Sequence, residues 1–179
     1  MSRRVLHRAR GFTLIEAALT TVIVGVGIVA TMGLFAACST QNIASSQMTT
    51  AMMLANNVHE AVVGLSFADP TSGHKIFGPE AGEKLATYND IDDFDGSSFN
   101  PPIDAQRNKV VGLTQYTQVV SVWPVYPNKL SANSNESSPD ISKTTYTGAL
   151  RIRVKVLFQV KPTDVATQIY QASWICLDN

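Results

Sequence analysis

The sequence predicts an α+β protein in which one long N-terminal helix, its first half transmembrane, packs against a C-terminal antiparallel β-sheet. Three observations predict this fold. From Ala17 to His59 the chain carries no Asp, Glu, Lys or Arg. Apolar residues recur every three to four positions as far as Leu65, which is the period of one helix face. Between residues 150 and 161 apolar residues alternate with mostly polar ones, as in a strand with one buried face.

Composition excludes several classes of protein. The 179 residues suit one domain, and an apolar content of 45% with 16% charged residues argues against a disordered chain. The 14 basic and 14 acidic residues balance, so the net charge gives no reason to expect a nucleic-acid partner. Two cysteines, Cys38 and Cys176, are too few for a disulfide scaffold and lack the spacing of a zinc site.

The N-terminal segment has the charge pattern of an exported or membrane-anchored protein. Four arginines and no acidic residue lie within residues 1–11. Residues 17–38 follow with mostly apolar side chains, and as a helix they would extend about 33 Å, enough to cross the hydrocarbon core of a bilayer. The basic flank predicts that the N-terminus stays cytoplasmic while everything after about residue 40 is exported.

Three ordinary export signals fit this segment less well. A cleaved secretory signal has a shorter apolar core than residues 17–38, and Glu16 lies at the start of this one. A lipoprotein would be acylated at Cys38, but Phe35 three residues earlier is a poor fit and the position is late. Ser2-Arg3-Arg4 gives only a weak indication of twin-arginine export.

Residues 10–16, Arg-Gly-Phe-Thr-Leu-Ile-Glu, fit another signal at every position. Together with the short basic leader and the apolar stretch, they resemble the type III signal of type IV prepilins and type II secretion pseudopilins. The resemblance implies a leader peptide at 1–11, removed by a prepilin peptidase between Gly11 and Phe12. It also implies N-methylation of Phe12 and a role in filament assembly for Glu16, the fifth residue of the mature chain.

The same resemblance implies a pilin-like fold and the function of a structural minor pilin in a type IV pilus-like filament. The implied partners are the prepilin peptidase, other pilin subunits through the N-terminal helix, the membrane and an inner-membrane assembly platform. The implied location is the bacterial inner membrane and then an extracytoplasmic filament. A pseudopilin of a type II secretion system is the alternative, and a membrane-anchored or lipoprotein-type exported binding domain is the alternative of another class. Gly33 departs from the family, because many major pilins have a helix-kinking Pro there.

The long helix divides into a hydrophobic transmembrane and assembly half, 12–38, and an amphipathic half, 39–68. Asp69-Pro70 is expected to end it, because a residue before Pro is pushed out of the helical region. The full helix would measure about 80 Å. The apolar stripe of the second half includes Met48 and Met52, which we expect to fill the core.

Residues 110–179 are expected to form the antiparallel sheet. Its strands are predicted at 110–126, with Pro124 interrupting or ending the first, at 150–161 and at 165–177. Residues 128–143 are rich in Ser and Asn and predict an exposed loop. The basic residues Arg151, Arg153 and Lys155 predict a solvated outer face rather than a DNA-binding stripe.

Residues 69–109 form a long connection between helix and sheet, with an acidic segment at its centre. Four aspartates lie close together there, Asp90, Asp92, Asp93 and Asp95. An EF-hand loop would need an oxygen ligand where Ile91 stands, so that motif fails. The favoured interpretation is a mobile, solvated acidic turn; a looser calcium site made by these four carboxylates is the other hypothesis.

No catalytic constellation accompanies these features. The histidines are His7, His59 and His74, in the leader, on the long helix and in a loop. The chain has no GxSxG, HExxH, P-loop or dinucleotide-binding fingerprint. The aspartates could act as acid and base, but no nucleophile is paired with them, so the sequence predicts that the protein is not an enzyme.

Overall fold

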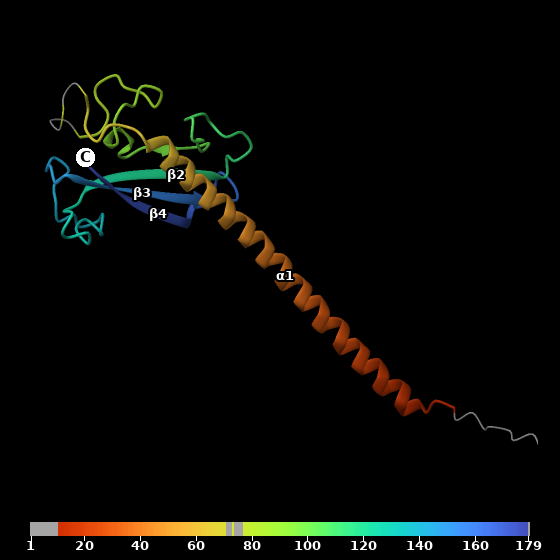
Figure 1. The fold of residues 1–179 in the computed structure, drawn as a ribbon. Coiled ribbons are helices and arrows are strands. Elements are labelled where there is room, and N and C mark those ends of the chain that lie inside the picture. Colours follow the sequence, from red (N-terminus) through yellow and green to blue (C-terminus); the bar gives the residue numbers. More distant parts are fainter. Residues whose placement is uncertain (1–10, 71–72, 74–76, 179) are drawn as a thin grey trace, which may run out of the picture. The chain divides into compact units, whose positions relative to one another are not determined.

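The fold was analysed in a computed structural model, which describes residues 11–70, 73 and 77–178. Residues 1–10, most of the expected leader, lie outside this range. One α-helix, α1 (Leu14–Val62), precedes a short 3-10 helix, η1 (Asp92–Phe94), and a four-stranded antiparallel sheet (Figure 1). The chain divides into two compact units, Met1–Ser45 and Ser46–Asn179, and α1 runs through the boundary. This arrangement confirms the predicted α+β fold class.

The first half of α1 satisfies its own polar groups. Thr13 lies just before the helix, and its hydroxyl accepts a hydrogen bond from the Glu16 amide at 3.3 Å, as an N-cap does. Within the helix, threonine hydroxyls donate to the carbonyl oxygen four residues earlier. Examples are Thr20 to Glu16 at 2.7 Å and Thr31 to Gly27 at 2.7 Å. These hydroxyl protons therefore need no partner from the surroundings, which suits a helix in lipid.

The second half of α1 buries one face. Its buried residues recur at helical spacing and belong to the core of the head, the name used here for residues 46–179: Ala51, Leu54, Ala55, Val58, Ala61 and Val62. Met48 and Met52 are exposed, so the expectation that they fill the core was wrong. The apolar face is rotated away from them, toward Leu54 and Ala61.

The helix ends earlier than predicted. Its last residue is Val62, not a residue next to Asp69-Pro70. Gly64 has a φ of +90°, and the Val63 amide still donates to the His59 carbonyl oxygen at 2.9 Å. A glycine in this left-handed conformation ends a helix because it has no Cβ to clash. Residues 63–68, expected to be helical, belong to the connection instead.

The sheet has the order β1-β2-β3-β4, with every neighbouring pair antiparallel. The strands are β1 (Ser98–Phe99), β2 (Tyr116–Pro124), β3 (Ala149–Phe158) and β4 (Thr167–Leu177). Pro124 is the last residue of β2, as expected for a residue that cannot donate to the ladder. β1 was not predicted; it lies within the long connection and pairs Ser98 with Val119.

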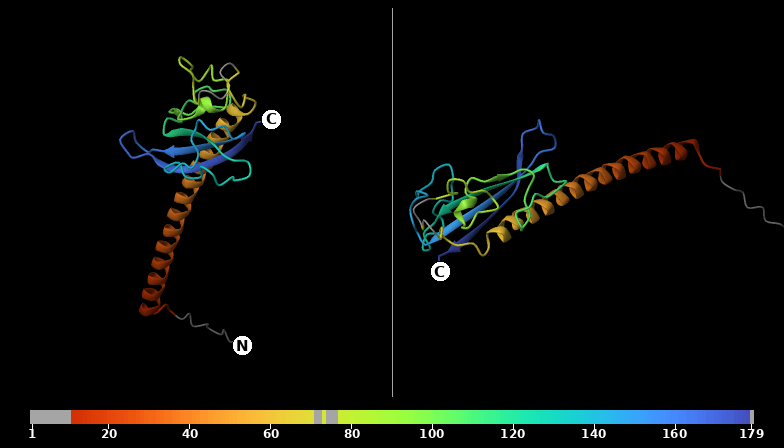
Figure 2. Two further views of the ribbon diagram at one scale, coloured as in Figure 1. Left: turned by 90° about the vertical axis from the view of Figure 1, so that its left-hand side faces the viewer. Right: turned by 90° about the horizontal axis from the view of Figure 1, so that it is seen from above.

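One face of the sheet packs against α1. In Figures 1 and 2 the C-terminal part of α1 lies across β2, β3 and β4. Val120, Val122, Ile152, Val154 and Val156 are buried in the same apolar core as the helix residues. The alternation predicted for residues 150–156 of β3 is therefore confirmed, because the residues of this stretch that enter the apolar core are the even-numbered ones.

A buried glutamine joins three parts of this core. Gln118 on β2 is fully buried, and its Nε2 donates to the carbonyl oxygens of Leu54 at 2.7 Å and Ile103 at 3.1 Å. Its Oε1 accepts a hydrogen bond from the Ile103 amide at 2.7 Å. The side chain thereby ties α1 and the long connection to the central part of the sheet, with both ends of its amide satisfied.

The connection between β2 and β3 folds back onto the sheet. Asn133 is buried, and its side chain donates to the Pro124 and Ile141 carbonyl oxygens and accepts from the Asp140 and Ile141 amides. Most residues of the loop at 128–143 are exposed, as expected, whereas Ala132, Asn133 and Ile141 are buried.

The basic residues of β3 are held by this same loop. Glu136 pairs with Arg153 at 2.7 Å and with Lys155 at 2.6 Å, while Arg151 donates to the Ala132 carbonyl oxygen at 3.3 Å. Arg153 is buried. The expected solvated outer face is therefore largely covered, and its cations are engaged within the chain.

Candidate functional site

The residues of the predicted processing and assembly site lie at the start of α1 and are accessible. Gly11, Phe12 and Glu16 are exposed, with Phe12 retaining 72% of its accessible surface. Phe12 precedes the helix, which begins at Leu14. The peptide bond between Gly11 and Phe12 thus lies in irregular backbone, a conformation that a protease can bind.

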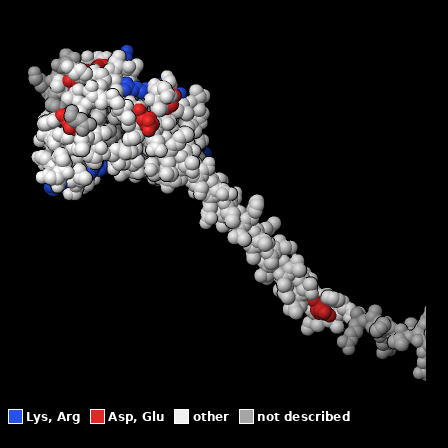
Figure 3. Space-filling view, viewed as in Figure 1, with Lys and Arg blue, Asp and Glu red and all other residues white. Residues whose placement is uncertain are grey.

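The first half of α1 exposes an unusually large apolar surface. Every residue from 11 to 46 is exposed. The helix is long and apolar enough to cross a membrane. In Figure 3 the visible face of this half carries one acidic group near its start and no other charge, and Glu16 is the acidic residue of the first turn. Soluble monomers rarely expose such continuous apolar surface, so it indicates lipid or other helices as its neighbours.

The four predicted aspartates are not a solvated turn. Asp90, Asp92 and Asp93 are buried, and the latter two lie in η1. This contradicts the favoured expectation of a mobile acidic turn. Burial follows from the residues between and around them, because Ile91 and Phe94 enter the apolar core and draw the neighbouring carboxylates inward.

The carboxylates of these aspartates point to different partners. Asp92 Oδ2 accepts a hydrogen bond from the Gly78 amide at 2.9 Å, and Asp90 Oδ1 accepts one from the Asp93 amide at 3.2 Å. Asp95 pairs with Lys143 at 2.5 Å and accepts from the Val122 amide at 2.9 Å. The structure therefore does not gather the four carboxylates into one ligand set.

Burial makes ionisation of this segment unfavourable. It raises the pKa of Asp90 to about 8, and the neighbouring charges of Asp92 and Asp93 add to the shift. Burial also raises the pKa of Asp92, although hydrogen bonds from the Gly78 amide and others oppose it. Carboxylates in this condition either share protons or are neutralised by a cation.

Two glutamates that the sequence analysis did not single out join Asp93. One carboxylate oxygen each from Glu80, Glu83 and Asp93 lies within 4.8 Å of the others. The glutamates belong to an irregular, Gly- and Pro-containing stretch without periodicity, so no local pattern placed them beside η1. Their approach depends on how the connection folds back.

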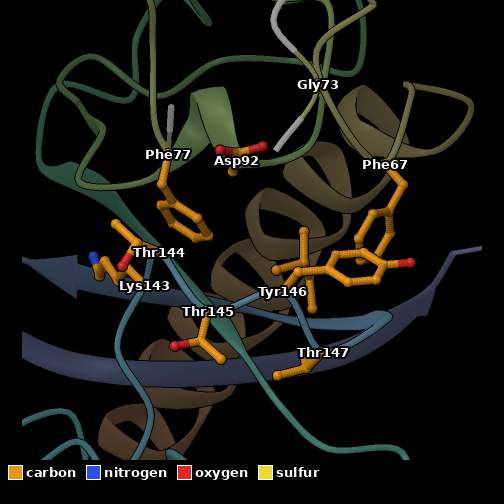
Figure 4. A pocket seen from close by; sticks show the side chains of 10 residues that line it. Phe67, Gly73, Phe77, Asp92, Lys143, Thr144, Thr145, Tyr146 and Thr147 are labelled. Carbon is orange, nitrogen blue, oxygen red and sulfur yellow. The ribbon is translucent and has the colours of Figure 1, made fainter. Parts of the chain in front are cut away.

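A small pocket adjoins this segment. Figure 4 shows Phe67 and Tyr146 on one side, Phe77 and Lys143 on the other, and Asp92 above. The Phe67 and Tyr146 rings meet edge to face, with 6.3 Å between their centroids. The pocket is small, with a volume of about 30 Å³ open to the centres of water-sized molecules.

His59, the histidine that the structure describes, belongs neither to the acidic cluster nor to the pocket. His59 lies on α1 and packs against Trp174 with 4.7 Å between the ring centroids, 3.5 Å from Glu60. His7 and His74 lie outside the described residues. Both cysteines, Cys38 and Cys176, are free.

Comparison of the chain with protein-family models, with curated proteins and with solved structures finds no match. The functional interpretation therefore depends on the residues and geometry described above.

Proposed function

We propose that this chain is a structural minor subunit of a type IV pilus-like filament. A prepilin peptidase removes residues 1–11, Phe12 becomes the N-methylated first residue, and the apolar half of α1 holds the subunit in the bacterial inner membrane. The subunit then leaves the bilayer through an assembly platform and packs into the filament through the same helix. It acts as a building block and not as an enzyme.

The observation that carries the proposal is Glu16 on an otherwise uncharged helix surface. An ionised carboxylate within an apolar segment costs about 2.5–3.5 kcal/mol at the centre of a membrane helix and less toward the interface. Helical neighbours one turn away could offset this cost only if they were basic. None of them is: they are Phe12, Thr13, Leu19 and Thr20.

Cleavage would create the missing cation. Once residues 1–11 are removed, the mature chain begins with the amine of Phe12, which remains basic after methylation. In the proposed filament this amine, from the same or a neighbouring subunit, pairs with Glu16 and sets the register of the incoming helix. A charge pair in an apolar bundle is retained only when both charges are matched, so losing either partner disfavours docking.

The exposed surface of the second half of α1 also supports packing between helices. Met48, Met52 and Met53 each keep nearly half of their surface, on a part of the helix whose opposite face is buried in the head. Flexible methionine side chains adapt to irregular apolar neighbours. The helix thus offers an apolar surface beyond its membrane-spanning length.

A pseudopilin of a type II secretion system is the closest alternative, since it would use the same signal and helix. The alternative of an anchored binding domain receives less support, because it leaves the motif at residues 10–16 without a role.

The test is the substitution Glu16→Ala, with Glu60→Ala as the control that removes an exposed carboxylate from the far end of the same helix. Two quantities are followed in the native host: processing to the Phe12 form and recovery of the subunit in sheared filaments. We expect Glu16→Ala to be processed normally but to enter filaments at least about tenfold less, because about 1.4 kcal/mol of docking energy already corresponds to that factor.

Glu60→Ala should resemble the wild type in both measurements. Normal incorporation of Glu16→Ala would contradict the proposed role of Glu16. Recovery with the secretion apparatus instead of surface filaments would favour the pseudopilin.

A further inference from the structure

The acidic cluster beside η1 has the chemistry of a cation site. Oxygens of Glu80, Glu83 and Asp93 converge within 4.8 Å of one another. Carboxylates at this spacing repel one another strongly unless something positive lies between them, and the repulsion is greater where water is excluded. Carboxylates that lie close together do not by themselves make a metal site. The evidence for a bound cation depends on which of their oxygens have hydrogen-bond donors.

Asp93 supplies the second observation. Its side chain is fully buried, and Oδ2 accepts hydrogen bonds from the Asn89 amide at 2.8 Å and the Asp90 amide at 3.3 Å. Its other oxygen, Oδ1, is buried and has no hydrogen-bond partner. A buried carboxylate oxygen without a partner costs several kcal/mol unless it binds a proton or a metal ion.

The side-chain amide of Asn89 lies among the same carboxylates. Its Nδ2 donates to Glu83 Oε1 at 3.2 Å and to Asp69 Oδ2 at 3.4 Å. Its Oδ1 is buried and, like that of Asp93, has no hydrogen-bond partner. Asn89 therefore presents its Nδ2, not its Oδ1, to the carboxylates, and Asp93 Oδ1 is a buried oxygen of the cluster that lacks a donor.

In the described part of the head, no Lys, Arg or His side chain forms an ion pair with Glu83 or Asp93. The ion pairs of the described residues engage other carboxylates, as Lys143 does with Asp95. Arg107 approaches the segment, but its guanidinium donates to the carbonyl oxygens of Tyr88 at 2.8 Å, Leu85 at 3.2 Å and Ala61 at 3.3 Å. These three hydrogen bonds all go to backbone oxygens and none goes to a carboxylate.

We propose that Glu80, Glu83 and Asp93 bind a calcium ion. The donors are all hard oxygens, which excludes the metals that prefer sulfur or imidazole. Glu80 and Glu83 come from irregular backbone, which suits the flexible six- to eight-oxygen coordination of calcium better than the strict octahedron of magnesium. The ion ties the stretch around Glu80 and Glu83 to η1.

This ligand set differs from the four aspartates between residues 90 and 95 that the sequence analysis considers, and only Asp93 belongs to both. The site would fix the fold of the long connection, in which Glu80, Glu83 and Asp93 all lie. Its consequence is a head whose stability depends on calcium, whatever filament the subunit joins.

The test is calcium titration of the full-length protein in detergent micelles, in chelator-treated buffer. Binding is measured by calorimetry, and unfolding of the head by the fluorescence of Trp123 and Trp174. Calcium-binding extracellular modules bind with dissociation constants of about 10⁻⁴ to 10⁻³ M, so the titration extends to about 10 mM. We expect one calcium ion per chain and an unfolding temperature that rises with calcium concentration, as linkage requires.

Glu83→Gln keeps the shape of a ligand that is not fully buried and removes its charge, and Glu60→Gln on α1 is the matched control. We expect Glu83→Gln to weaken calcium binding at least about tenfold, equivalent to about 1.4 kcal/mol. Glu60→Gln should bind as the wild type does. Unchanged affinity in Glu83→Gln would overturn the assignment.

A measurement on the wild type tests the site even if Glu83→Gln does not fold. The luminescence of terbium, excited through Tyr88 next to Asn89, should rise when terbium binds and fall when calcium displaces the terbium. Absence of this signal, together with no calcium-dependent stabilisation at about 10 mM, would overturn the site and leave carboxylates that share protons. Magnesium binding as tightly as calcium would overturn the choice of metal.

Discussion

The two halves of α1 have the same backbone but different surroundings. From residue 14 to 46 every side chain is exposed, although most are apolar, whereas from Ala51 to Val62 one face is buried in the head. Both halves are regular helix, so helix formation does not depend on packing within this chain. The buried half is stabilised by its own sheet. In the function proposed above, the exposed half packs first against lipid and then against neighbouring helices.

The comparison also applies to charge. In the head, Glu136 has two cations and a hydroxyl as partners, while Glu16 makes no ion pair with any described residue. An acidic residue that is matched within its own chain contributes to folding. One that is unmatched points to a partner in another molecule or, after cleavage, to a newly formed terminus.

The largest expected effect comes from making the same substitution in each half. Leu54 is fully buried and Leu19 is 62% exposed. Leu54→Ala should lower the free energy of unfolding of the head by about 2–5 kcal/mol, because it leaves a cavity. Leu19→Ala should change it by less than about 0.5 kcal/mol. Denaturant unfolding in micelles, followed by Trp fluorescence, measures both, and equal effects would contradict the division of the helix.

A polar contact sharpens the same comparison. Gln118→Leu keeps the approximate volume but leaves the Leu54 carbonyl oxygen and both backbone groups of Ile103 without this partner. We expect a loss of about 2–3 kcal/mol in the free energy of unfolding. Gln171→Leu on β4, at an exposed position, is the control and should cost less than about 0.5 kcal/mol. If Gln118→Leu leaves the free energy of unfolding unchanged, apolar packing alone holds the second half of α1 on the sheet.

Acid should reveal how much the ion-paired carboxylate of Glu136 stabilises the head. Burial alone would raise the pKa of Glu136, but hydrogen bonds from Lys155, Ser121 and Arg153 outweigh it and hold the pKa at about 2. Because the folded pKa lies below the ordinary value of 4.5, the stabilisation is complete above pH 4.5 and is lost as the pH falls toward 2.

We expect this carboxylate to contribute about 1–2 kcal/mol at pH 7, after allowance for its partial exposure. Glu136→Gln should remove that amount and flatten the decline in stability between pH 4.5 and 2. Unfolding curves at a series of pH values measure this. An unchanged pH profile would show that these ion pairs contribute nothing to folding.

The smallest expected effect on the head is that of Met52→Ser. Met52 is exposed on the second half of α1, so the free energy of unfolding should change by less than about 0.5 kcal/mol. In filaments the same substitution should reduce incorporation, since it replaces apolar helix surface with a hydroxyl. A large loss of head stability would mean that Met52 packs within the subunit after all.

Local patterns predicted the parts of the fold that local forces determine. The charge-free stretch and the apolar period predicted α1, and the alternation around Ile152 and Val154 predicted β3 with the correct buried face. The helix ends before the position that Pro70 predicts. Gly64 precedes this proline, and a glycine commonly follows the last residue of a helix because it readily takes a positive φ. The apolar period wrongly predicts that Met48 and Met52 lie in the core. The period shows that one face of the helix is apolar, but it does not show which of the apolar residues the sheet covers.

Features that depend on distant pairing left no local signal. β1 is two residues long and exists through its pairing with β2. Glu136 meets Arg153 and Lys155 only because the loop folds back, and Glu80 meets Asp93 for the same reason. The proposed cleavage and assembly residues, Gly11, Phe12 and Glu16, belong to one continuous motif, so the sequence alone predicts them, and their roles stay a prediction.

The most direct test of the central claim is the mass of the mature N-terminus. Protein purified from the membrane of a host with an active prepilin peptidase should begin at Phe12 and carry one methyl group on its amine. An intact Met1 in such a host, or a lipid on Cys38, would contradict the account of this chain as a pilin-type subunit.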